Sequence, residues 1–269
     1  MNLITKSIIF TDLDATLLDH YDYSYHEAEE MLRFIDDNQI PLIFTTSKTA
    51  VEVIELQRIM GISEPFIVEN GGGIFIPHNY KRFNVEEHTE KDGYKVIELG
   101  KTYCECKHFF KTHDYFDVRT FSNMSPYQIS RLTKLDNHHA NMAKQRDFSE
   151  PFVLNIDEQL SQIEEEAAAQ GFKITKGGRF FHLMGEKQDK GVAVKRVVEL
   201  FADTIEEEPY VIALGDSKND IQMLQAADLP ILIPRHDETF IALDLPNLVR
   251  ARYKSSKGWN SSLKELFNV

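Results

Sequence analysis

The sequence has few of the features that mark thiolate-metal, membrane or nucleic-acid-binding proteins. Only two cysteines occur among the 269 residues, Cys104 and Cys106, and no further cysteine is present to complete a thiolate zinc site. No apolar run approaches the ~18 residues that a membrane span requires. Basic residues number 30 against 43 acidic ones. The resulting formal net charge of −13 disfavours a nucleic-acid partner, which would require clustered lysine and arginine.

The N-terminal segment MNLITKSIIFTDLD becomes polar too soon for a signal peptide, so we expect a cytoplasmic location. Hydrophobic residues make up 42% of the chain and charged residues 27%, which is typical of a globular protein. The length suits one large domain or two modest ones with a substantial core. An acidic chain can still bind an anionic substrate in a small local site. The sequence leaves the oligomeric state open.

Alternating strand and helix patterns occupy both ends of the chain. Buried strands are expected over 8–11, 40–46, 65–70, 210–215 and 229–233. Helices are expected to begin at the capping boxes Ser24-x-x-Glu27 and Thr49-x-x-Glu52, to cover 191–201 and 219–226, and to end the chain after Trp259. This order predicts an α/β fold, with a three-layer, Rossmann-like core whose parallel sheet carries helices on both faces.

The pattern changes between about residues 84 and 186. Strands are expected there over 94–99, 118–122, 152–156, 172–175 and 180–184, and helices over 101–113, from Ser125-Pro126 onward and over 158–170. We therefore expect a catalytic core formed by 1–83 and 187–269, with an inserted α/β cap domain over 84–186.

Polar side chains gather where the core strands are expected to end, and ligands bind at the carboxyl ends of strands in an open parallel sheet. They are Asp12, Asp14, Thr46, Ser47, Lys48, Lys190, Asp216, Asn219 and Asp220. Carboxylates that converge at one edge repel one another, and a divalent cation removes this repulsion. A small oxygen-rich site completed by waters and a phosphate oxygen suits Mg²⁺. The expected metal group is Asp12, Asp14, Asp216, Asn219 and Asp220.

The two aspartates at the end of the first strand suit two chemical roles. Asp12 is placed as a nucleophile and metal ligand that forms an aspartyl phosphate. Asp14 is placed as the general acid and base, because residues i and i+2 of an extended strand point the same way. Thr46 and Lys190 would hold the phosphoryl group, whose transfer depends mainly on positioning and charge neutralisation.

Four segments in this order, DLDATLL, TTSK, DKGVA and GDSKND, resemble the motifs of the haloacid dehalogenase superfamily of phosphatases. The resemblance implies that Asp12 is the nucleophile, Asp14 the acid and base, and Asp216 a Mg²⁺ ligand. One position departs from the family, which usually has glycine where this chain has Ala15. Glycine adopts backbone dihedrals that alanine resists, so the turn after Asp14 is expected to differ slightly.

Further segments, SKT, VENGGGIFIP, RDFSEPF, GGRFFHLM and GWN, are similar to the mannosyl-3-phosphoglycerate phosphatases. That resemblance implies a small-molecule substrate, a phosphorylated glycosyl-glycerate, and a cap that closes over it. The implied substrate contacts are Ser47, Lys48, Asn70, Arg146, Ser149, Glu150, Arg179 and His182.

Several of these contacts have alternatives. Lys48 lies either in the site or on the surface, and Asn70 belongs to a turn that is compatible with a substrate-facing loop. Arg146 and Glu150 either bind substrate or form an i,i+4 helix pair. Arg179 and His182 would face opposite sides of a regular strand.

The expected function is Mg²⁺-dependent hydrolysis of mannosyl-3-phosphoglycerate to mannosylglycerate and phosphate. The glucosyl ester is an alternative because the two sugars differ in the orientation of one hydroxyl, and a broader sugar-phosphate phosphatase is another. Outside enzymes, a phosphoacceptor module is disfavoured by Asp14, which would hasten dephosphorylation, and by the insertion over the site. A silent binding protein is disfavoured by the complete set of four motifs.

Overall fold

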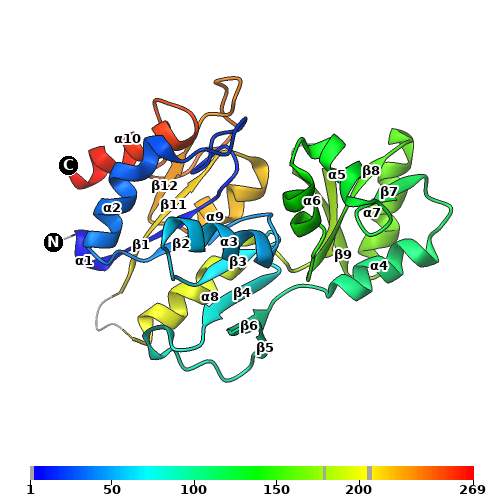
Figure 1. Cartoon of the computed structure of the whole chain (residues 1–269), viewed down its shortest axis with the longest axis horizontal. Helices are drawn as coiled ribbons and strands as arrows, with labels where there is room; N and C mark the ends of the chain where they lie inside the picture. The colour runs from blue at the N-terminus through cyan, green and yellow to red at the C-terminus, as the bar shows by residue number, and fades with distance from the viewer. Residues whose placement is uncertain (1–2, 178–179, 205–207) are drawn as a thin grey trace.

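The computed structural model describes residues 3–177, 180–204 and 208–269, which form two α/β units (Figure 1). The larger unit contains β1 (Ser7–Thr11), β2 (Leu42–Thr45), β3 (Phe66–Val68), β4 (Gly73–Pro77), β5 (Thr89–Lys91), β6 (Tyr94–Glu98), β11 (Tyr210–Gly215), β12 (Leu229–Leu232) and β13 (Val249–Arg250). These strands form one sheet in the order β13-β12-β11-β1-β2-β3-β4-β6-β5. The strands from β13 to β3 are parallel, and β4, β6 and β5 extend the sheet antiparallel.

Helices cover both faces of this sheet, so the three-layer α/β core is confirmed (Figure 1). One face packs α2 (Glu29–Asp37), α3 (Ala50–Met60) and α10 (Ser255–Phe267), and the other packs α8 (Lys190–Ala202) and α9 (Ile221–Gln225). Within β1, Ile9 faces the first layer, whereas Ile8 and Phe10 face the second. This alternation follows from the two-residue period of a strand. The short elements α1 (Leu3–Lys6), η1 (His26–Ala28), η2 (Tyr80–Arg82) and η4 (Lys218–Asp220) complete the unit.

The smaller unit is inserted between β6 and α8 and has its own antiparallel sheet. Its strands are β7 (Val118–Thr120), β8 (Ser149–Leu154), β9 (Phe172–Gly177) and β10 (Phe180–Gly185), in the order β7-β8-β10-β9. One face packs α4 (Tyr103–Thr112) and α7 (Leu160–Ala168), which follows η3 (Asp157–Gln159). The other face packs α5 (Pro126–Thr133) and α6 (Asn137–Ala143). Each face therefore buries a separate apolar cluster.

The local helix signals were partly right. Thr49 and Glu52 form the expected capping box of α3, and Gly61 ends that helix with a φ of 71°. The capping box expected at Ser24 and Glu27 is wrong, because Oγ of Ser24 accepts from the amide of His26, two residues on, and α2 begins later, at Glu29. A serine bonded two residues ahead closes a small turn instead of starting a helix.

The strand expected over 94–99 is present as β6, but it does not belong to the inserted unit. It pairs with β4 in the core sheet, and β5 pairs with β6. No sequence pattern indicates this edge, because its strands pair only through the tertiary fold. The boundary at residue 84 stays a prediction, and the pairing favours an insertion that begins after Glu98.

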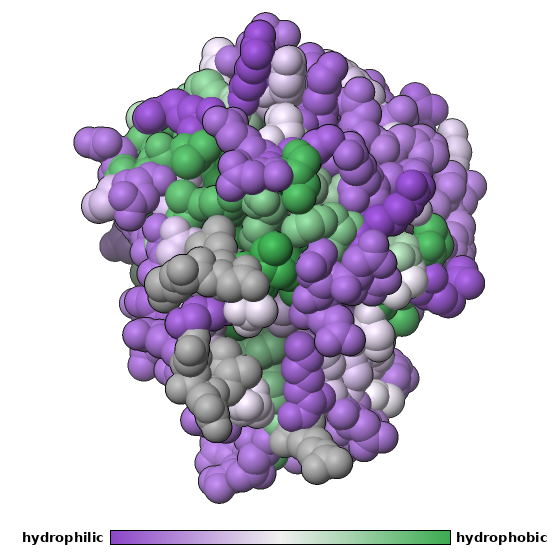
Figure 2. All heavy atoms as spheres, turned by 90° about the vertical axis from the view of Figure 1, so that its left-hand side faces the viewer, coloured by the Kyte–Doolittle hydropathy of each residue, from purple (hydrophilic) through white to green (hydrophobic). Residues whose placement is uncertain are grey.

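Two linkers join the units and pass close to each other. A Cβ added to Gly100 would lie 2.1 Å from Oε1 of Gln188, and one added to Gly185 would lie 2.8 Å from the backbone nitrogen of Lys101. Position 185 therefore requires glycine, because the neighbouring atom is backbone, whereas a side chain at position 100 would displace the buried Gln188. The face of the molecule that carries both termini shows an apolar region bordered by hydrophilic side chains (Figure 2). Across the described ranges, no helix combines the length and the apolar character needed to cross a bilayer.

Candidate active site

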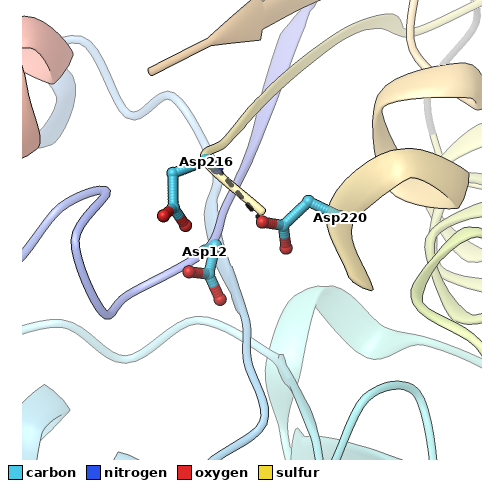
Figure 3. A group of neighbouring side chains, drawn as sticks. All are labelled: Asp12, Asp216 and Asp220. Carbon is cyan, nitrogen blue, oxygen red and sulfur yellow. Dashed lines mark hydrogen bonds between the residues drawn. The ribbon is translucent and has the colours of Figure 1, made fainter. Parts of the chain in front are cut away.

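Three buried carboxylates meet at the carboxyl ends of two neighbouring strands. Asp12 follows β1, Asp216 follows β11, and Asp220 lies in η4. Because β1 and β11 are paired in parallel, their ends meet at the same edge of the sheet. One oxygen from each of the three carboxylates lies within 4.8 Å of the others. Figure 3 shows Asp12 and Asp216 next to each other, with Asp220 approaching from η4.

Lys190 supplies a positive charge to this group from the first residue of α8. Its Nζ donates to Oδ1 of Asp12 at 2.7 Å and to Oδ1 of Asp220 at 2.6 Å. The side chain is 0% exposed, so water does not screen these contacts. Burial by itself lowers the pKa of Lys190, but the two aspartates raise the pKa above its usual range. The ammonium therefore stays charged.

One ammonium does not balance three carboxylates. Burial, reinforced by repulsion from Asp220, raises the pKa of Asp12 to about 7 even though Lys190 opposes the change. Burial and the same repulsion raise the pKa of Asp216 to about 8. A second positive charge would allow both groups to ionise. The donor set, hard carboxylate oxygens at a sheet edge, fits a divalent cation such as Mg²⁺.

Asp220 differs from the other two aspartates in its hydrogen bonds. Its Oδ2 accepts from the backbone amides of Asp216 at 3.1 Å and Ser217 at 2.9 Å, while Oδ1 accepts from Lys190. Asp12 accepts from Lys190 at Oδ1, and Asp216 accepts from Thr16 at 3.4 Å. Within the described ranges, Asp12 and Asp216 each keep an oxygen that no protein donor uses. These two residues therefore keep oxygens available to a metal ion, whereas both oxygens of Asp220 already accept hydrogen bonds. The expected metal role of Asp220 stays a prediction.

Asp14 lies apart from the three-carboxylate group, with 44% of its side chain exposed. Its Oδ1 lies 2.9 Å from Nζ of Lys48, whose side chain is only 13% exposed. The surface alternative for Lys48 is therefore wrong. Ala15, which follows Asp14, has a φ of 62°, so the departure from glycine falls on a left-handed position that an alanine adopts at a cost.

The loops after β2 and β3 bring further expected residues to the same edge. Thr46 is buried, and its Oγ1 accepts from the backbone amide of Lys48 at 3.2 Å, which leaves the hydroxyl hydrogen for a ligand. Nδ2 of Asn219 donates to Oδ1 of Asn70 at 2.9 Å. Oδ1 of Asn219 accepts from the hydroxyl of Ser217, so both polar atoms of its side chain have protein partners. A metal role for Asn219, as for Asp14, stays a prediction.

Arg146 joins the inserted unit to the core through Glu69, a residue outside the group of site residues expected from the sequence. Nε of Arg146 donates to Oε2 of Glu69 at 3.1 Å, and Nη2 donates to the carbonyl of Ser47 at 3.0 Å. Ser149 also donates to Glu69, at 2.6 Å. The alternative of an i,i+4 helix pair with Glu150 is wrong, because Arg146 lies beyond the end of α6.

The signal for Glu69 was its place in the sequence. An acidic residue directly after a buried strand is expected at the ligand edge, and Glu69 follows β3. Its side chain is 0% exposed and also accepts from the amides of Asp147 at 2.6 Å and Phe148 at 3.2 Å. A buried carboxylate with four donors is a docking point between the two units.

The remaining expected cap residues differ in their surroundings. Glu150 is fully buried, accepts from the amide of Ser122 at 3.0 Å, and burial raises its pKa. His182 is buried on β10, and burial, with a contribution from Arg146, lowers its pKa to about 3, so the imidazole is neutral. Nδ1 of His182 has no hydrogen-bond partner among the described residues. Arg179 lies outside the described residues.

Comparison with known proteins places the chain in a family. The profile of the haloacid dehalogenase-like hydrolase family matches residues 9–240. A protein of Persephonella marina named glucosyl-3-phosphoglycerate/mannosyl-3-phosphoglycerate phosphatase is 46% identical over 262 residues, 97% of each chain. A protein of the same name from Methanococcoides burtonii is 38% identical over 266 residues, again 97% of each.

Solved structures agree on the fold. The crystal structure of Thermoplasma acidophilum 0175 has a TM-score of 0.70 with 19% identity, and the match covers 98% of both chains. The chain therefore belongs to the haloacid dehalogenase-like hydrolases and, within them, to the family of the glucosyl- and mannosyl-3-phosphoglycerate phosphatases.

Proposed function

We propose that this phosphoric monoester hydrolase cleaves mannosyl-3-phosphoglycerate to mannosylglycerate and phosphate through an aspartyl phosphate on Asp12. The observation that carries the proposal is the group formed by Asp12, Asp216 and Lys190, with Nζ of Lys190 2.7 Å from Asp12. Glucosyl-3-phosphoglycerate is supported as a substrate too, because the relatives from Persephonella marina and Methanococcoides burtonii are named for both sugars.

In the proposed reaction, a carboxylate oxygen of Asp12 attacks phosphorus while the bond from phosphorus to the ester oxygen breaks. Asp14 gives its proton to the departing alkoxide, which leaves as the free hydroxyl of the glycosyl-glycerate. Asp14 then removes a proton from water, the water oxygen attacks phosphorus, and the bond from Asp12 to phosphorus breaks. Phosphate is released and both aspartates return to their starting states.

Lys190 and Thr46 hold the phosphoryl oxygens in this scheme, through an ammonium charge and a hydroxyl hydrogen bond. Asp12 and Asp216 would be the protein ligands of Mg²⁺, which when bound supplies charge neutralisation for the phosphoryl group. We assign Arg146 and Ser149 to docking of the inserted unit, because both donate to Glu69. Ser47, Asn70, Glu150, Arg179 and His182 remain proposed substrate contacts.

A substrate panel tests this function. Phosphate release from mannosyl- and glucosyl-3-phosphoglycerate, and from an unrelated sugar phosphate, is measured with Mg²⁺ and with a chelator. We expect Mg²⁺-dependent turnover of the phosphoglycerate esters, compared by kcat/KM. A strong preference for the unrelated sugar phosphate would overturn the substrate assignment. Absence of metal-dependent turnover, even with an aryl phosphate, would favour a silent binding protein, and a long-lived phosphoenzyme would favour a phosphoacceptor module. A cytoplasmic location stays a prediction.

A further inference from the structure

Backbone hydrogen bonds fix the position of residue Lys48. It lies between the end of β2 and Thr49, the N-cap residue of α3. Its amide donates to Oγ1 of Thr46 at 3.2 Å, and its carbonyl accepts from the amide of Glu69 at 3.1 Å. The capping box that begins at Thr49 fixes the following turn. The side chain of Lys48 therefore starts from a rigid point beside the active site.

Three groups surround the ammonium of Lys48. Nζ lies 2.9 Å from Oδ1 of Asp14, 3.8 Å from Oε1 of Glu52, and 5.0 Å from the centroid of the Tyr23 ring. Burial by itself lowers the pKa of Lys48, but Asp14 and Glu52 raise the pKa above its usual range, so the group stays charged. A charged ammonium over an aromatic face is attracted to it.

Tyr23 belongs to a tight turn that follows the first motif. The amide of Asp19 donates to the carbonyl of Ser24 at 2.8 Å, and the amide of Tyr23 donates to the carbonyl of Asp19 at 3.2 Å. Tyr23 itself has a φ of 59°. This backbone geometry places the ring beside Lys48, so the turn and the loop after β2 enclose the ammonium from two sides.

The two lysines of the site serve different aspartates. Lys190 bonds Asp12, the nucleophile of the proposed reaction, whereas Lys48 contacts Asp14. We propose that Lys48, backed by Tyr23, is a positioning residue that holds the carboxyl group of Asp14 in line with the ester oxygen of the substrate. This inference rests on the proposed function. It replaces the expected direct contact of Lys48 with substrate, because the ammonium is enclosed by protein groups.

The need for such a residue follows from the exposure of Asp14. With 44% of its side chain exposed, Asp14 could turn toward water if nothing held it. Proton transfer in a transition state contributes roughly 10²–10⁴-fold to a rate and requires hydrogen-bond reach. A displacement of about 1 Å can cost roughly 10²-fold. Without Lys48, the enzyme should therefore lose rate in steps that use the proton of Asp14.

The test compares two leaving groups. An alkoxide such as the glycosyl-glycerate needs a proton to depart, whereas p-nitrophenolate does not. For Lys48→Met, we expect kcat/KM to fall roughly 10–100-fold with the phosphoglycerate ester and only severalfold with p-nitrophenyl phosphate. Lys48→Arg should recover most of the rate, and Tyr23→Ala should show a smaller loss with the same leaving-group dependence. Lys195→Met removes an exposed lysine of α8 and is the matched control.

A double variant separates positioning from substrate binding. In the Asp14→Asn background there is no acid to position, so adding Lys48→Met should cost no further rate. A loss that is equal for both leaving groups, or that persists in the Asp14→Asn background, would show that Lys48 contacts substrate and would overturn the inference. An unchanged rate for Lys48→Met would overturn it as well. Absence of Mg²⁺-dependent turnover by the unaltered protein would instead refute the proposed function, and this inference with it.

Discussion

Replacing Arg146 by methionine removes one partner of the buried ion pair between the inserted unit and the core. The side chains of Arg146 and Glu69 are 4% and 0% exposed, and the pair distance is 3.1 Å. Removing one partner of such a pair costs about 3–5 kcal/mol, because the other charge stays in a medium of low dielectric. Glu69 would keep three donors, from Asp147, Phe148 and Ser149. We therefore expect a loss of about 3 kcal/mol in the free energy of unfolding, the lower end of that range.

Equilibrium unfolding in urea measures this loss. Far-UV circular dichroism follows both units, and the fluorescence of the single tryptophan, the buried Trp259, follows the core. Arg196→Met is the matched control, since it breaks an exposed arginine–glutamate pair with a distance of 3.0 Å. Exposed pairs contribute about 0–1 kcal/mol, so the control should hardly shift the midpoint. Equal midpoints for the two variants would refute the reasoning.

A second variant tests whether the charge on Glu69 is responsible. The double variant Glu69→Gln, Arg146→Met removes both charges of the pair, so that no unpaired charge stays buried. We expect the double variant to lose less stability than the sum of the two single changes, because residues in contact are coupled by about 0.5–3 kcal/mol. A purely additive result would mean that packing, and not the ion pair, joins the two units.

Three further predictions concern the catalytic edge. Asp12→Asn should abolish turnover in the phosphate-release assay yet leave a folded protein that binds substrate in calorimetry, because removing one negative charge does not weaken attraction to phosphate. Near-normal turnover would contradict the assignment of Asp12 as the nucleophile. Undetectable binding would contradict the charge argument. The pKa values of Asp12 and Asp216 are raised to about 7 and about 8, against 3.8 for an ordinary aspartate. Between about pH 4 and about pH 8 the folded, metal-free protein therefore binds more protons than the unfolded chain, and its free energy of unfolding falls as pH rises. In chelator, the Tm of the unaltered protein minus that of Asp216→Asn should therefore fall over this pH window. Added Mg²⁺ should raise the Tm more at pH 8 than at pH 5. A Tm difference in chelator that rises with pH would contradict the raised pKa values. Ala15→Gly should raise the free energy of unfolding by up to about 1 kcal/mol. Releasing alanine from its left-handed backbone conformation gains about 1–2 kcal/mol, whereas the entropy that glycine adds to the unfolded chain costs about 0.4–1 kcal/mol. A lower stability of the variant in urea would contradict this.

Much of the fold was predictable where neighbours in sequence determine structure. The capping box of Thr49 and Glu52, the left-handed Gly61 and the start of α5 at Ser125-Pro126 all depend on contacts within one helical turn. The alternation of apolar strands and amphipathic helices likewise indicated a parallel sheet with a helix layer on each face. Because ligand residues follow strand ends in such a sheet, Asp12 and Asp216 could be expected to meet although they lie far apart in the chain.

The antiparallel edge formed by β4, β6 and β5 was not predictable in the same way. Short strands such as β5 carry little pattern of their own, and their pairing is decided by the sheet that they join. For this reason β6 was expected in the inserted unit although it belongs to the core sheet.

The sequence by itself determined the alternating strands and helices of the parallel part of the core and the chemical groups gathered at its edge, because both depend on residue type and short-range spacing. Only the tertiary structure decided the partners of those groups. Arg146 meets Glu69 and Lys48 meets Asp14 across long stretches of chain, and which cation faces which carboxylate depends on how the packed units exclude water from each pair. Spacing along the chain does not predict these pairs, because burial and distance are properties of the folded protein.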